Sequence, residues 1–228
     1  MEIDAAGGTP TLFDQTAAGF TAKVDKLIDA GRYQRGNLFL SAAVSTVPTH
    51  GDILDYGCGP GRISALLARQ GFHVLGVDPS PAMISVARRQ RLDKLQVEFR
   101  LCDSHPVAAK TNAFDAIVCS SVIEYETHPV ELLRKFSNAL RPSGVLIISF
   151  ANSRSLSRAL FQRRNLHLGA QVHTWTGQQF TGLVEEGGFK PIRKTVYFES
   201  IFDRTPPLSF LSASPSLGAL GLMVAVKQ

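Results

Sequence analysis

The sequence is poor in cysteine, lacks a leader-like N-terminus and has only a weak excess of positive charge. Its three cysteines, an odd number at scattered positions in 228 residues, argue against a disulfide framework and for a reducing compartment. The first residues, MEIDAAGG, contain neither a basic stretch nor an apolar one, so the sequence predicts no signal peptide. We therefore expect a cytoplasmic protein.

No long, uniformly apolar run is present either. Residues 208–226 have about the length of a membrane-spanning helix, but they include Pro215, two glycines and four serines. Such a composition favours turns followed by a terminal strand over a membrane span. The hydrophobic fraction of 44% argues against disorder and fits a globular protein.

The net charge of +5 is a modest excess that favours acidic partners only weakly. The basic residues gather in two groups, which are Arg88, Arg89, Arg91 and Lys94, and Arg154, Arg158, Arg163 and Arg164. Both groups can be solvated helix faces. The second group can also be a site for the phosphate, carboxylate or sugar-acid group of a substrate, and the sequence leaves that choice open.

Short apolar runs typical of strands alternate with helical periodicity through the middle of the chain. The strand-like runs are 52–56, 72–77, 96–101, 114–119 and 144–150, and the helical stretches are 62–69, 81–91 and 130–140. This alternation predicts parallel βαβ units with right-handed crossovers. Near-continuous apolar runs indicate strands that are covered on both faces. We predict an α/β, doubly wound, mostly parallel sheet with helices on both faces.

The rest of the chain adds helices, late strands and two irregular stretches. The helices are expected at 20–30, 36–46 and 177–186, and the strands at 189–200 and about 220–226. Residues 151–175 and 200–218 interrupt the rhythm, and long interruptions of a compact domain are often functional. We predict one domain, 1–228, with an N-terminal helical cap at 1–48 and these two stretches as insertions that cover the substrate.

The stretch LDYGCGPGRIS, residues 54–64, places three glycines between a predicted strand and a predicted helix. Gly57, Gly59 and Gly61 permit positive φ and let a ligand lie against the main chain. The helix that follows adds backbone N–H groups and the positive end of its dipole. Taken alone, such a turn is common to nucleotide and dinucleotide sites.

Three carboxylates narrow the choice of ligand. Asp55 lies two residues before Gly57, Asp78 ends the second predicted strand, and Asp103 follows the third. The spacing of Asp78 from the glycines is that of the acidic residue that meets ribose hydroxyls in doubly wound folds. A diphosphate is poorly served by so many anions. A cationic cofactor that carries a ribose and an amino acid suits them better.

Five stretches of the sequence resemble, in order and spacing, the motifs of class I S-adenosylmethionine-dependent methyltransferases. They read ILDYGCGPGRIS, VLGVDPSPAMISVARR, VEFRLCD, FDAIVCSSVIEY and ALRPSGVLIISF. The nearest shape is the small-molecule branch that includes the ubiquinone- and menaquinone-pathway enzymes. The resemblance implies a seven-stranded Rossmann-like sheet whose last strand is antiparallel and inserted beside the sixth. It also implies S-adenosyl-L-methionine as cofactor and S-adenosyl-L-homocysteine as product.

The resemblance further implies which residues contact each part of the cofactor. The residues expected at the methionine part are Asp55, Gly57, Cys58, Gly59, Gly61, Cys119 and Ser120. Asp78 is expected at the ribose. The residues expected at the adenine are Pro79, Met83, Asp103 and Ser104. In some relatives an upstream basic residue helps to hold the methionine carboxylate. Arg35 is the candidate for that role here.

Methyl transfer is an in-line displacement, so positioning carries much of the catalysis. A hydroxyl acceptor also needs a base or a metal to remove its proton. The candidate bases are His128 and Glu124, which follow the fourth predicted strand, and His173 beside the single tryptophan. A lone histidine is more often a surface or structural residue. The ubiquinone-pathway O-methyltransferases carry a Glu-x-x-Glu-His cluster linked to a metal at this point, and this chain keeps only its middle acid, Glu124, so we predict no metal.

We predict methyl transfer to a small molecule, with an oxygen acceptor favoured over nitrogen or carbon. An anionic acceptor and a homodimer are left open. A nucleic-acid methyltransferase is the first alternative, but the fourth strand ends in CSSV and not in an Asn/Asp-Pro-Pro-aromatic signature. An NAD-dependent oxidoreductase would leave the carboxylates unexplained. A non-catalytic protein that keeps the cofactor pocket is the third alternative.

Overall fold

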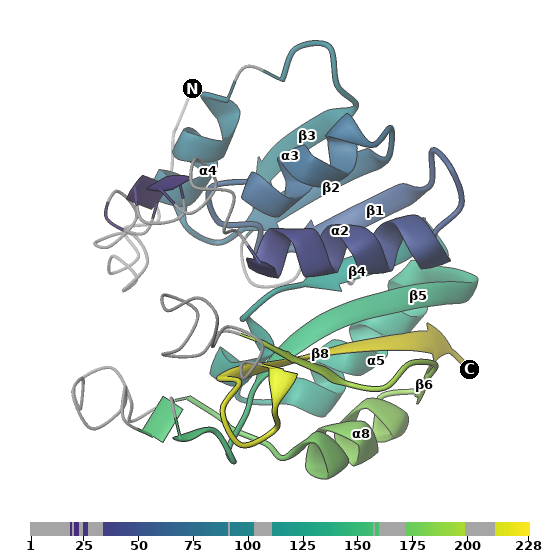
Figure 1. The fold of residues 1–228 in the computed structure, drawn as a ribbon. Coiled ribbons are helices and arrows are strands. Elements are labelled where there is room, and N and C mark those ends of the chain that lie inside the picture. Colours follow the sequence, from purple (N-terminus) through teal and green to yellow (C-terminus); the bar gives the residue numbers. More distant parts are fainter. Residues whose placement is uncertain are drawn as a thin grey trace, which may run out of the picture.

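The computed structural model describes residues 19, 21–22, 25–26, 34–90, 92–102, 111–156, 158–159, 172–198 and 213–228. They form one sheet in the order β3-β2-β1-β4-β5-β8-β6, with β7 also paired to β8 (Figure 1). The strands are β1 (Asp52–Tyr56), β2 (His73–Asp78), β3 (Val97–Leu101), β4 (Phe114–Cys119), β5 (Leu140–Ala151), β6 (Phe189–Pro191), β7 (Val196–Phe198) and β8 (Leu220–Lys227). β1 to β5 are parallel, and β8 is antiparallel to its three neighbours. The predicted α/β class and antiparallel last strand are confirmed.

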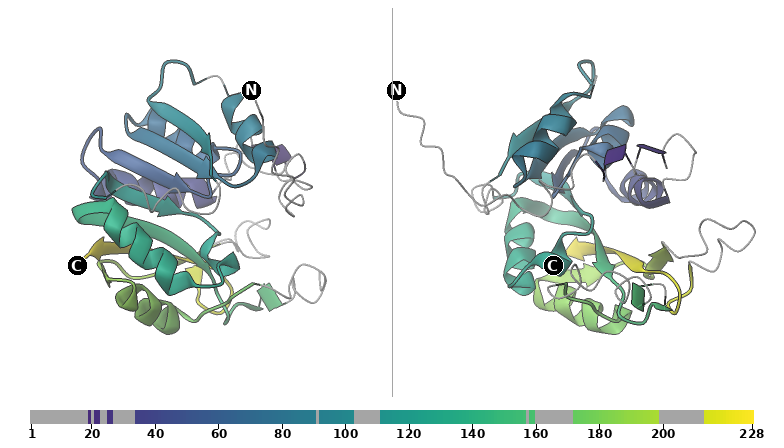
Figure 2. Two further views of the ribbon diagram at one scale, coloured as in Figure 1. Left: turned by 180° about the vertical axis from the view of Figure 1, so that it is seen from behind. Right: turned by 90° about the vertical axis from the view of Figure 1, so that its left-hand side faces the viewer.

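Helices cover both faces of this sheet (Figure 2). They are α2 (Gln34–Thr46), α3 (Arg62–Arg69), α4 (Pro81–Arg88), α5 (Pro129–Ala139), α8 (Gly177–Glu186) and the 3-10 turn η2 (Ile123–Tyr125). Successive residues of β1 face opposite layers. Ile53 packs with Phe39 of α2 and Leu67 of α3, whereas Leu54 packs in the cluster that contains Phe136 of α5. This burial on both sides explains why the strands read as continuous apolar runs.

The helix starts follow the signals in the sequence. The Ser80 hydroxyl accepts the Met83 N–H at 3.1 Å, with Pro81 as the first residue of α4. At α8, Thr176 and Gln179 form a reciprocal capping box. Both helices begin where the sequence predicts. The segment 20–30 lies mostly outside the described residues, as does most of 200–218.

The single strand predicted over 189–200 is wrong in one respect, because two short strands replace it. β6 and β7 both pair with β8, but the four residues 192–195 between them stand opposite only two residues of β8. Pro191 ends β6 and cannot donate a ladder hydrogen bond. The extra residues therefore bulge out of the ladder, and pairing resumes at Val196.

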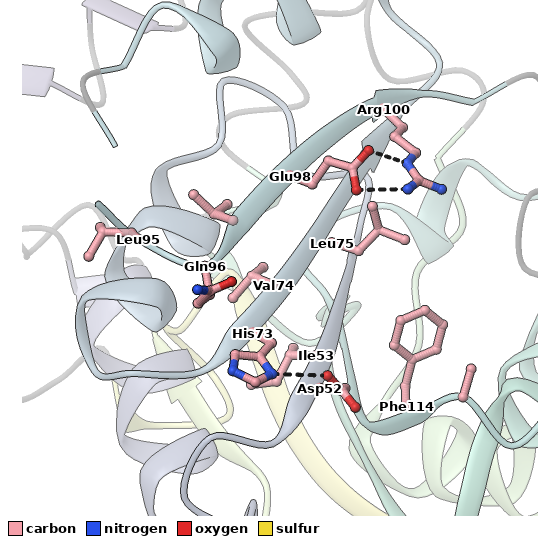
Figure 3. A pocket seen from close by; sticks show the side chains of 12 residues that line it. Asp52, Ile53, His73, Val74, Leu75, Leu95, Gln96, Glu98, Arg100 and Phe114 are labelled. Carbon is pink, nitrogen blue, oxygen red and sulfur yellow. Dashed lines mark hydrogen bonds and ion pairs between the residues drawn. The ribbon is translucent and has the colours of Figure 1, made fainter. Parts of the chain in front are cut away.

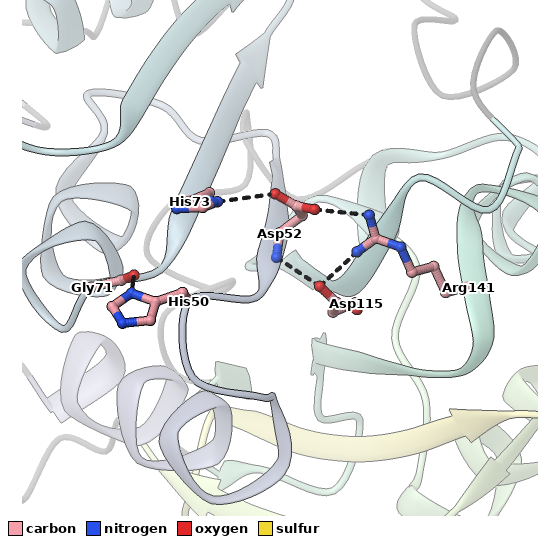
Figure 4. Close-up of polar contacts among 6 residues, drawn as sticks. All are labelled: His50, Asp52, Gly71, His73, Asp115 and Arg141. Carbon is pink, nitrogen blue, oxygen red and sulfur yellow. Dashed lines mark hydrogen bonds and ion pairs between the residues drawn. The ribbon is translucent and has the colours of Figure 1, made fainter.

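An ion-pair network joins the strands at the end of the sheet where β1 and β4 begin (Figure 4). Arg141 donates to Asp52 at 2.8 Å and to Asp115 at 2.6 Å, and His73 lies 3.3 Å from the Asp52 carboxylate. The hydrogen bond from Arg141 is the largest influence on the pKa of Asp52, which lies below its usual value. The network ties β1, β2, β4 and β5 together at the end opposite the glycine turn.

A shallow groove is lined by residues of β1, β2 and β3 and by the start of β4 (Figure 3). Leu75, Glu98, Arg100 and Phe114 are among the residues that line it. It runs past Asp52 and the start of β2, away from the glycines, so we do not identify it with the candidate site. Among the described helices, none is long and apolar enough to cross a membrane.

Candidate active site

The glycine turn follows β1 and runs directly into α3. Gly57, Gly59 and Gly61 all have left-handed φ, of 73°, 52° and 74°. A Cβ on Gly57 would lie 2.2 Å from a Val122 methyl group, whereas a Cβ on Gly59 would meet no atom of the described residues within 4 Å. Glycine is therefore required at position 57 both by the left-handed backbone and by the close contact with Val122. Gly59 faces open space at the carboxyl end of the sheet, which is where a ligand can approach its main chain.

Asp78, at the end of β2, anchors this turn. Its carboxylate accepts the Gly59 N–H at 2.8 Å and the Ser80 N–H at 2.9 Å. The Val77 carbonyl accepts the N–H groups of Gly57 and Cys58 at 2.8 and 2.9 Å. The turn is thus held to the end of β2 by both backbone and side-chain acceptors. Asp78 therefore shapes the turn in addition to the ribose role predicted for it.

Asp55 is buried beneath the turn, and Ser64 of α3 donates to it at 2.5 Å. The pKa of Asp55 is raised to about 6, mainly by burial; the hydrogen bond from Ser64 acts to lower it and the nearby charge of Asp78 acts to raise it. The two carboxylates thus lie close together, as their positions at adjacent strand ends predict. The third, Asp103, and its neighbour Ser104 lie outside the described residues.

The remaining residues predicted to contact the cofactor differ in how far their side chains are exposed to solvent. Pro79 is exposed beside the start of α4, and Met83 is buried at 2% exposure. The thiols of Cys58 and Cys119 pack in the core, where burial raises the pKa of both well above the usual value. Their side chains therefore serve packing. The Ser120 hydroxyl, by contrast, is buried with no hydrogen-bond partner among the described residues.

The chain makes a strained turn after β4. Ser121 has a φ of 55°, and its N–H donates to the hydroxyl of the buried Ser149 on β5 at 2.9 Å. A non-glycine residue in the left-handed region costs about 1–2 kcal/mol, and such strain gathers at functional sites. The turn leads into η2, where Glu124 is 2% exposed and one carboxylate oxygen, Oε2, has no described partner.

Glu124 is surrounded by groups from separate parts of the chain. Burial raises the pKa of its carboxyl to about 6, while the charges of Arg35 and Arg158 act to lower it. The His173 N–H donates to the Glu124 carbonyl oxygen at 2.8 Å. Charges from α2 and from the 151–175 stretch therefore act on this carboxylate, and His173 bonds to the backbone of the same residue. A buried carboxyl with a pKa near neutrality can accept a proton at physiological pH.

Of the three predicted bases, the structure brings two together. The backbone hydrogen bond between His173 and Glu124 places these two residues side by side. The exposed ring of His173 stacks on Trp175, with the ring centroids 5.8 Å apart. His128 is exposed at the start of α5 and caps that helix with no side-chain hydrogen bond. None of the described contacts joins His128 to Glu124 or to His173.

The 151–175 stretch is fixed to the sheet at both ends. Trp175 accepts the Ser153 N–H at 3.0 Å and donates to the Ala151 carbonyl at 2.9 Å. The Asn152 amide donates to the carbonyls of Pro215 and Gly218 at 2.7 and 2.8 Å. The segment between Asn152 and Trp175 thus leaves the sheet and returns to it at one place, next to η2.

Sequence reasoning missed the supporting hydroxyls of this site. Ser64 fixes Asp55, and Ser149 fixes the turn at Ser121. Ser64 is the single hydroxyl on the buried face of α3, and Ser149 is the single hydroxyl in the apolar strand GVLIISF. A lone buried hydroxyl in such a run signals a polar partner, because burial without one costs free energy. The strain at Ser121 has no comparable signal in the sequence.

Comparison with known proteins gives three findings. A family model described as a methyltransferase domain matches residues 29–194. A ubiquinone biosynthesis O-methyltransferase from Xylella fastidiosa (strain 9a5c) is 38% identical over 102 residues, which are 44% of this chain and 42% of that protein. The chain spans less than half the length of the curated relatives it matches.

Solved structures match most of the chain. A methyltransferase from Haloferax volcanii, solved in complex with the activator Trm112, has a TM-score of 0.69 at 17% identity, covering 96% of this chain and 99% of that one. The magnesium protoporphyrin IX methyltransferase of Synechocystis PCC 6803, solved with bound SAH, has a TM-score of 0.67 at 19% identity, covering 95% and 96%. At these identities the likeness shows the fold.

Proposed function

The chain belongs to the methyltransferase domain family, and from this premise we propose that it is an S-adenosylmethionine-dependent methyltransferase acting on a small-molecule hydroxyl. One observation carries the proposal. A turn of left-handed glycines is held by the carboxylate of Asp78 and presents Gly59 to open space. The arrangement fits a ligand that lies against bare main chain and brings hydroxyls to a carboxylate.

The residues at the turn fit the cofactor part by part. Gly59 lacks the Cβ that would otherwise occupy the open space beside the turn. Asp78 would accept the ribose hydroxyls, and the buried, unpartnered hydroxyl of Ser120 would meet the methionine part. Arg35 would hold the methionine carboxylate from α2, which packs on α3 behind the turn. The negative charges of Asp55 and Asp78 favour a cofactor that carries positive charge.

Bound S-adenosylmethionine supplies a methyl group already activated by its positive sulfur. The protein's task is then to align the acceptor oxygen and to take its proton. Glu124 is the base that the geometry supports best, because its carboxylate is buried at the end of β4 with an unpartnered oxygen. Its raised pKa, about 6, suits a group that must accept and release a proton near neutral pH. His173 would cover this carboxylate, and His128 stands further out as an alternative base.

An oxygen acceptor is favoured by the names of the matched relatives, which are O-methyltransferases. A cytoplasmic location is part of the same proposal, supported by three free and buried cysteines. An anionic acceptor is supported by the arginines around Glu124. A homodimer and a single domain with an N-terminal cap remain proposals from the sequence.

Calorimetric titration with S-adenosylhomocysteine tests the cofactor part. We expect saturable one-to-one binding, and no binding of NAD⁺ under the same conditions. Transfer of a labelled methyl group from S-adenosylmethionine to a panel of phenols and alcohols, with matched amines as controls, tests the reaction. A protein that binds neither S-adenosylmethionine nor S-adenosylhomocysteine contradicts the proposal outright. Binding without transfer to any acceptor contradicts its catalytic half.

A further inference from the structure

Arg158 is placed over Glu124 by a helix start that is anchored from two sides. The hydroxyl of Ser155, itself 2% exposed, accepts the Arg158 N–H at 3.2 Å and donates to the Leu217 carbonyl at 3.0 Å. Leu156 donates its N–H to the Ser216 carbonyl at 2.9 Å. The backbone that carries Arg158 is therefore tied to the turn before β8, and the side chain projects from a fixed base.

The guanidinium of Arg158 is poorly compensated. Burial lowers its pKa, against the opposing influence of Glu124 and Tyr125. Its Nε is buried and makes no hydrogen bond to any described residue. A buried N–H group without a hydrogen bond is costly. Such an arrangement is stabilised when an anion binds, and a guanidinium fits carboxylate and phosphate oxygens in a bidentate manner.

The positive charges near Glu124 come from separate parts of the chain. Two arginines, Arg35 and Arg158, act on the Glu124 carboxylate. Arg35 comes from α2 on the side of the glycine turn, whereas Arg158 comes from the stretch after β5. Because Arg35 is proposed to hold the methionine carboxylate of the cofactor, Arg158 is the arginine assigned to the acceptor.

On the premise of the proposed function, we infer that the acceptor is a hydroxy compound with an oxyanion, a carboxylate or a phosphate, which Arg158 binds while its hydroxyl lies at Glu124. The same molecule then satisfies the orphaned Arg158 Nε and the orphaned Glu124 Oε2. When the acceptor hydroxyl gives its proton to Glu124, the nearby arginines also stabilise the oxygen anion that forms.

Calorimetry on the protein saturated with S-adenosylhomocysteine tests this assignment. The probes are hydroquinone, 4-hydroxybenzoate and 4-hydroxyphenyl phosphate, which share a phenolic hydroxyl and differ in the group opposite it. We expect the anionic probes to bind at least ten times more tightly than hydroquinone. The stronger of the two identifies the oxyanion as carboxylate or phosphate. Equal binding of all three overturns the inference.

Three variants sharpen the test. Arg158→Gln should weaken the anionic probes about ten- to a hundredfold, the usual effect of losing charge-assisted hydrogen bonds, and Arg158→Lys should restore part of the loss. Arg154→Gln removes the same charge from an exposed residue nearby and should change nothing. Affinity for S-adenosylhomocysteine should be equal in all of them. A loss of that affinity in Arg158→Gln would assign Arg158 to the cofactor and overturn the inference.

The cofactor titration is made first, so the two levels of failure are separate. A wild-type protein that does not bind S-adenosylhomocysteine refutes the proposed function, and this inference with it. A wild-type protein that binds it but shows no preference for anions refutes this inference alone. Thermal melts of each variant, compared with wild type, establish that a loss of binding is not a loss of fold.

Discussion

The Asp78 carboxylate accepts the N–H of Gly59 at 2.8 Å, across the gap between the end of β2 and the turn after β1. The residue proposed to hold the ribose is thus the residue that holds the turn. The proposed role in nucleoside recognition would couple ribose binding to the shape of the glycine turn through one side chain.

Asp78→Asn should weaken S-adenosylhomocysteine binding about ten- to a hundredfold. The change removes a charged acceptor, and hydrogen bonds to charged groups are worth about 1.5–3 kcal/mol. Calorimetry measures the affinity, with Asp93→Asn as a control that removes an exposed aspartate on the surface. Equal affinity in both variants would show that Asp78 does not contact the ribose.

Gly57→Ala and Gly59→Ala should separate packing from binding. Both place alanine in the left-handed region, which costs about 1–2 kcal/mol, but only the Gly57 variant forces a Cβ against Val122. In urea unfolding we expect Gly57→Ala to lose about 1–3 kcal/mol more than Gly59→Ala, the usual penalty for overpacking. Gly59→Ala should instead lose cofactor affinity, since its Cβ enters the open space. The reverse order in either measurement would be inconsistent with the turn described here.

Asp55→Asn should stabilise the protein at alkaline pH and not at acid pH. Burial raises the folded-state pKa of Asp55 from 3.8 to about 6, so ionisation opposes folding. Its favourable contribution is complete below about pH 4 and is lost as pH rises through 6. A shift of roughly two units corresponds to about 3 kcal/mol. Urea unfolding from pH 4.5 to 8 should show the difference between variant and wild type growing up to about pH 6 and staying constant above it. A constant difference would mean that Asp55 does not titrate in this range.

Glu124→Gln should reduce kcat about 10²–10⁴-fold, the usual range for loss of a general base, with little change in cofactor affinity. In the wild type, kcat should rise as pH increases through about 6, where the Glu124 carboxyl ionises, and the variant should lack this limb. Glu131→Gln, an exposed change on α5, is the matched control. Full activity in Glu124→Gln would return the assignment to His173 or His128.

Arg141→Gln should lower the free energy of unfolding by about 1 kcal/mol at neutral pH. Asp52 and Arg141 are 41% and 39% exposed, so solvent screening keeps the effect small. The pKa of Asp52 is below its usual value of 3.8. Its contribution is therefore present above about pH 4 and is lost as pH falls through the folded-state pKa.

The Arg141 prediction has a clear comparison. Arg134→Gln removes a looser pair with Glu186, at 3.7 Å and more than half exposed, and should change stability by less than 0.5 kcal/mol, roughly the range of ordinary surface changes. S-adenosylhomocysteine affinity should be unchanged by either substitution. An Arg141→Gln protein with wild-type stability at pH 7 would show that the ion pairs of Arg141 do not stabilise the fold.

The sheet and its helices could be predicted well because their signals are local. The bounds of β1, β4, α3 and α8 match the predicted ranges residue for residue, since apolar periodicity, glycines and caps all lie within the segments themselves. The family and the cofactor class were also predicted correctly from motifs that are continuous in the sequence. The alternative of an NAD-dependent oxidoreductase is set aside by the family match.

The parts that could not be predicted depend on partners distant in the sequence. The break between β6 and β7 is set by pairing with β8, which lies more than twenty residues further along. The turn at Ser121 is held by Ser149, and Arg158 meets Glu124 only because Asn152 and Ser155 are tied to the 214–218 turn. No local pattern encodes these contacts.

The β-bridge between Asn152 and Trp175 holds together the two ends of the segment between them. A segment whose two ends are clamped together can be lengthened or exchanged at a small entropic penalty, because closure entropy grows only slowly with loop length. On the proposed function, exchanging the chain between these two residues would alter the acceptor side and leave the glycine turn untouched.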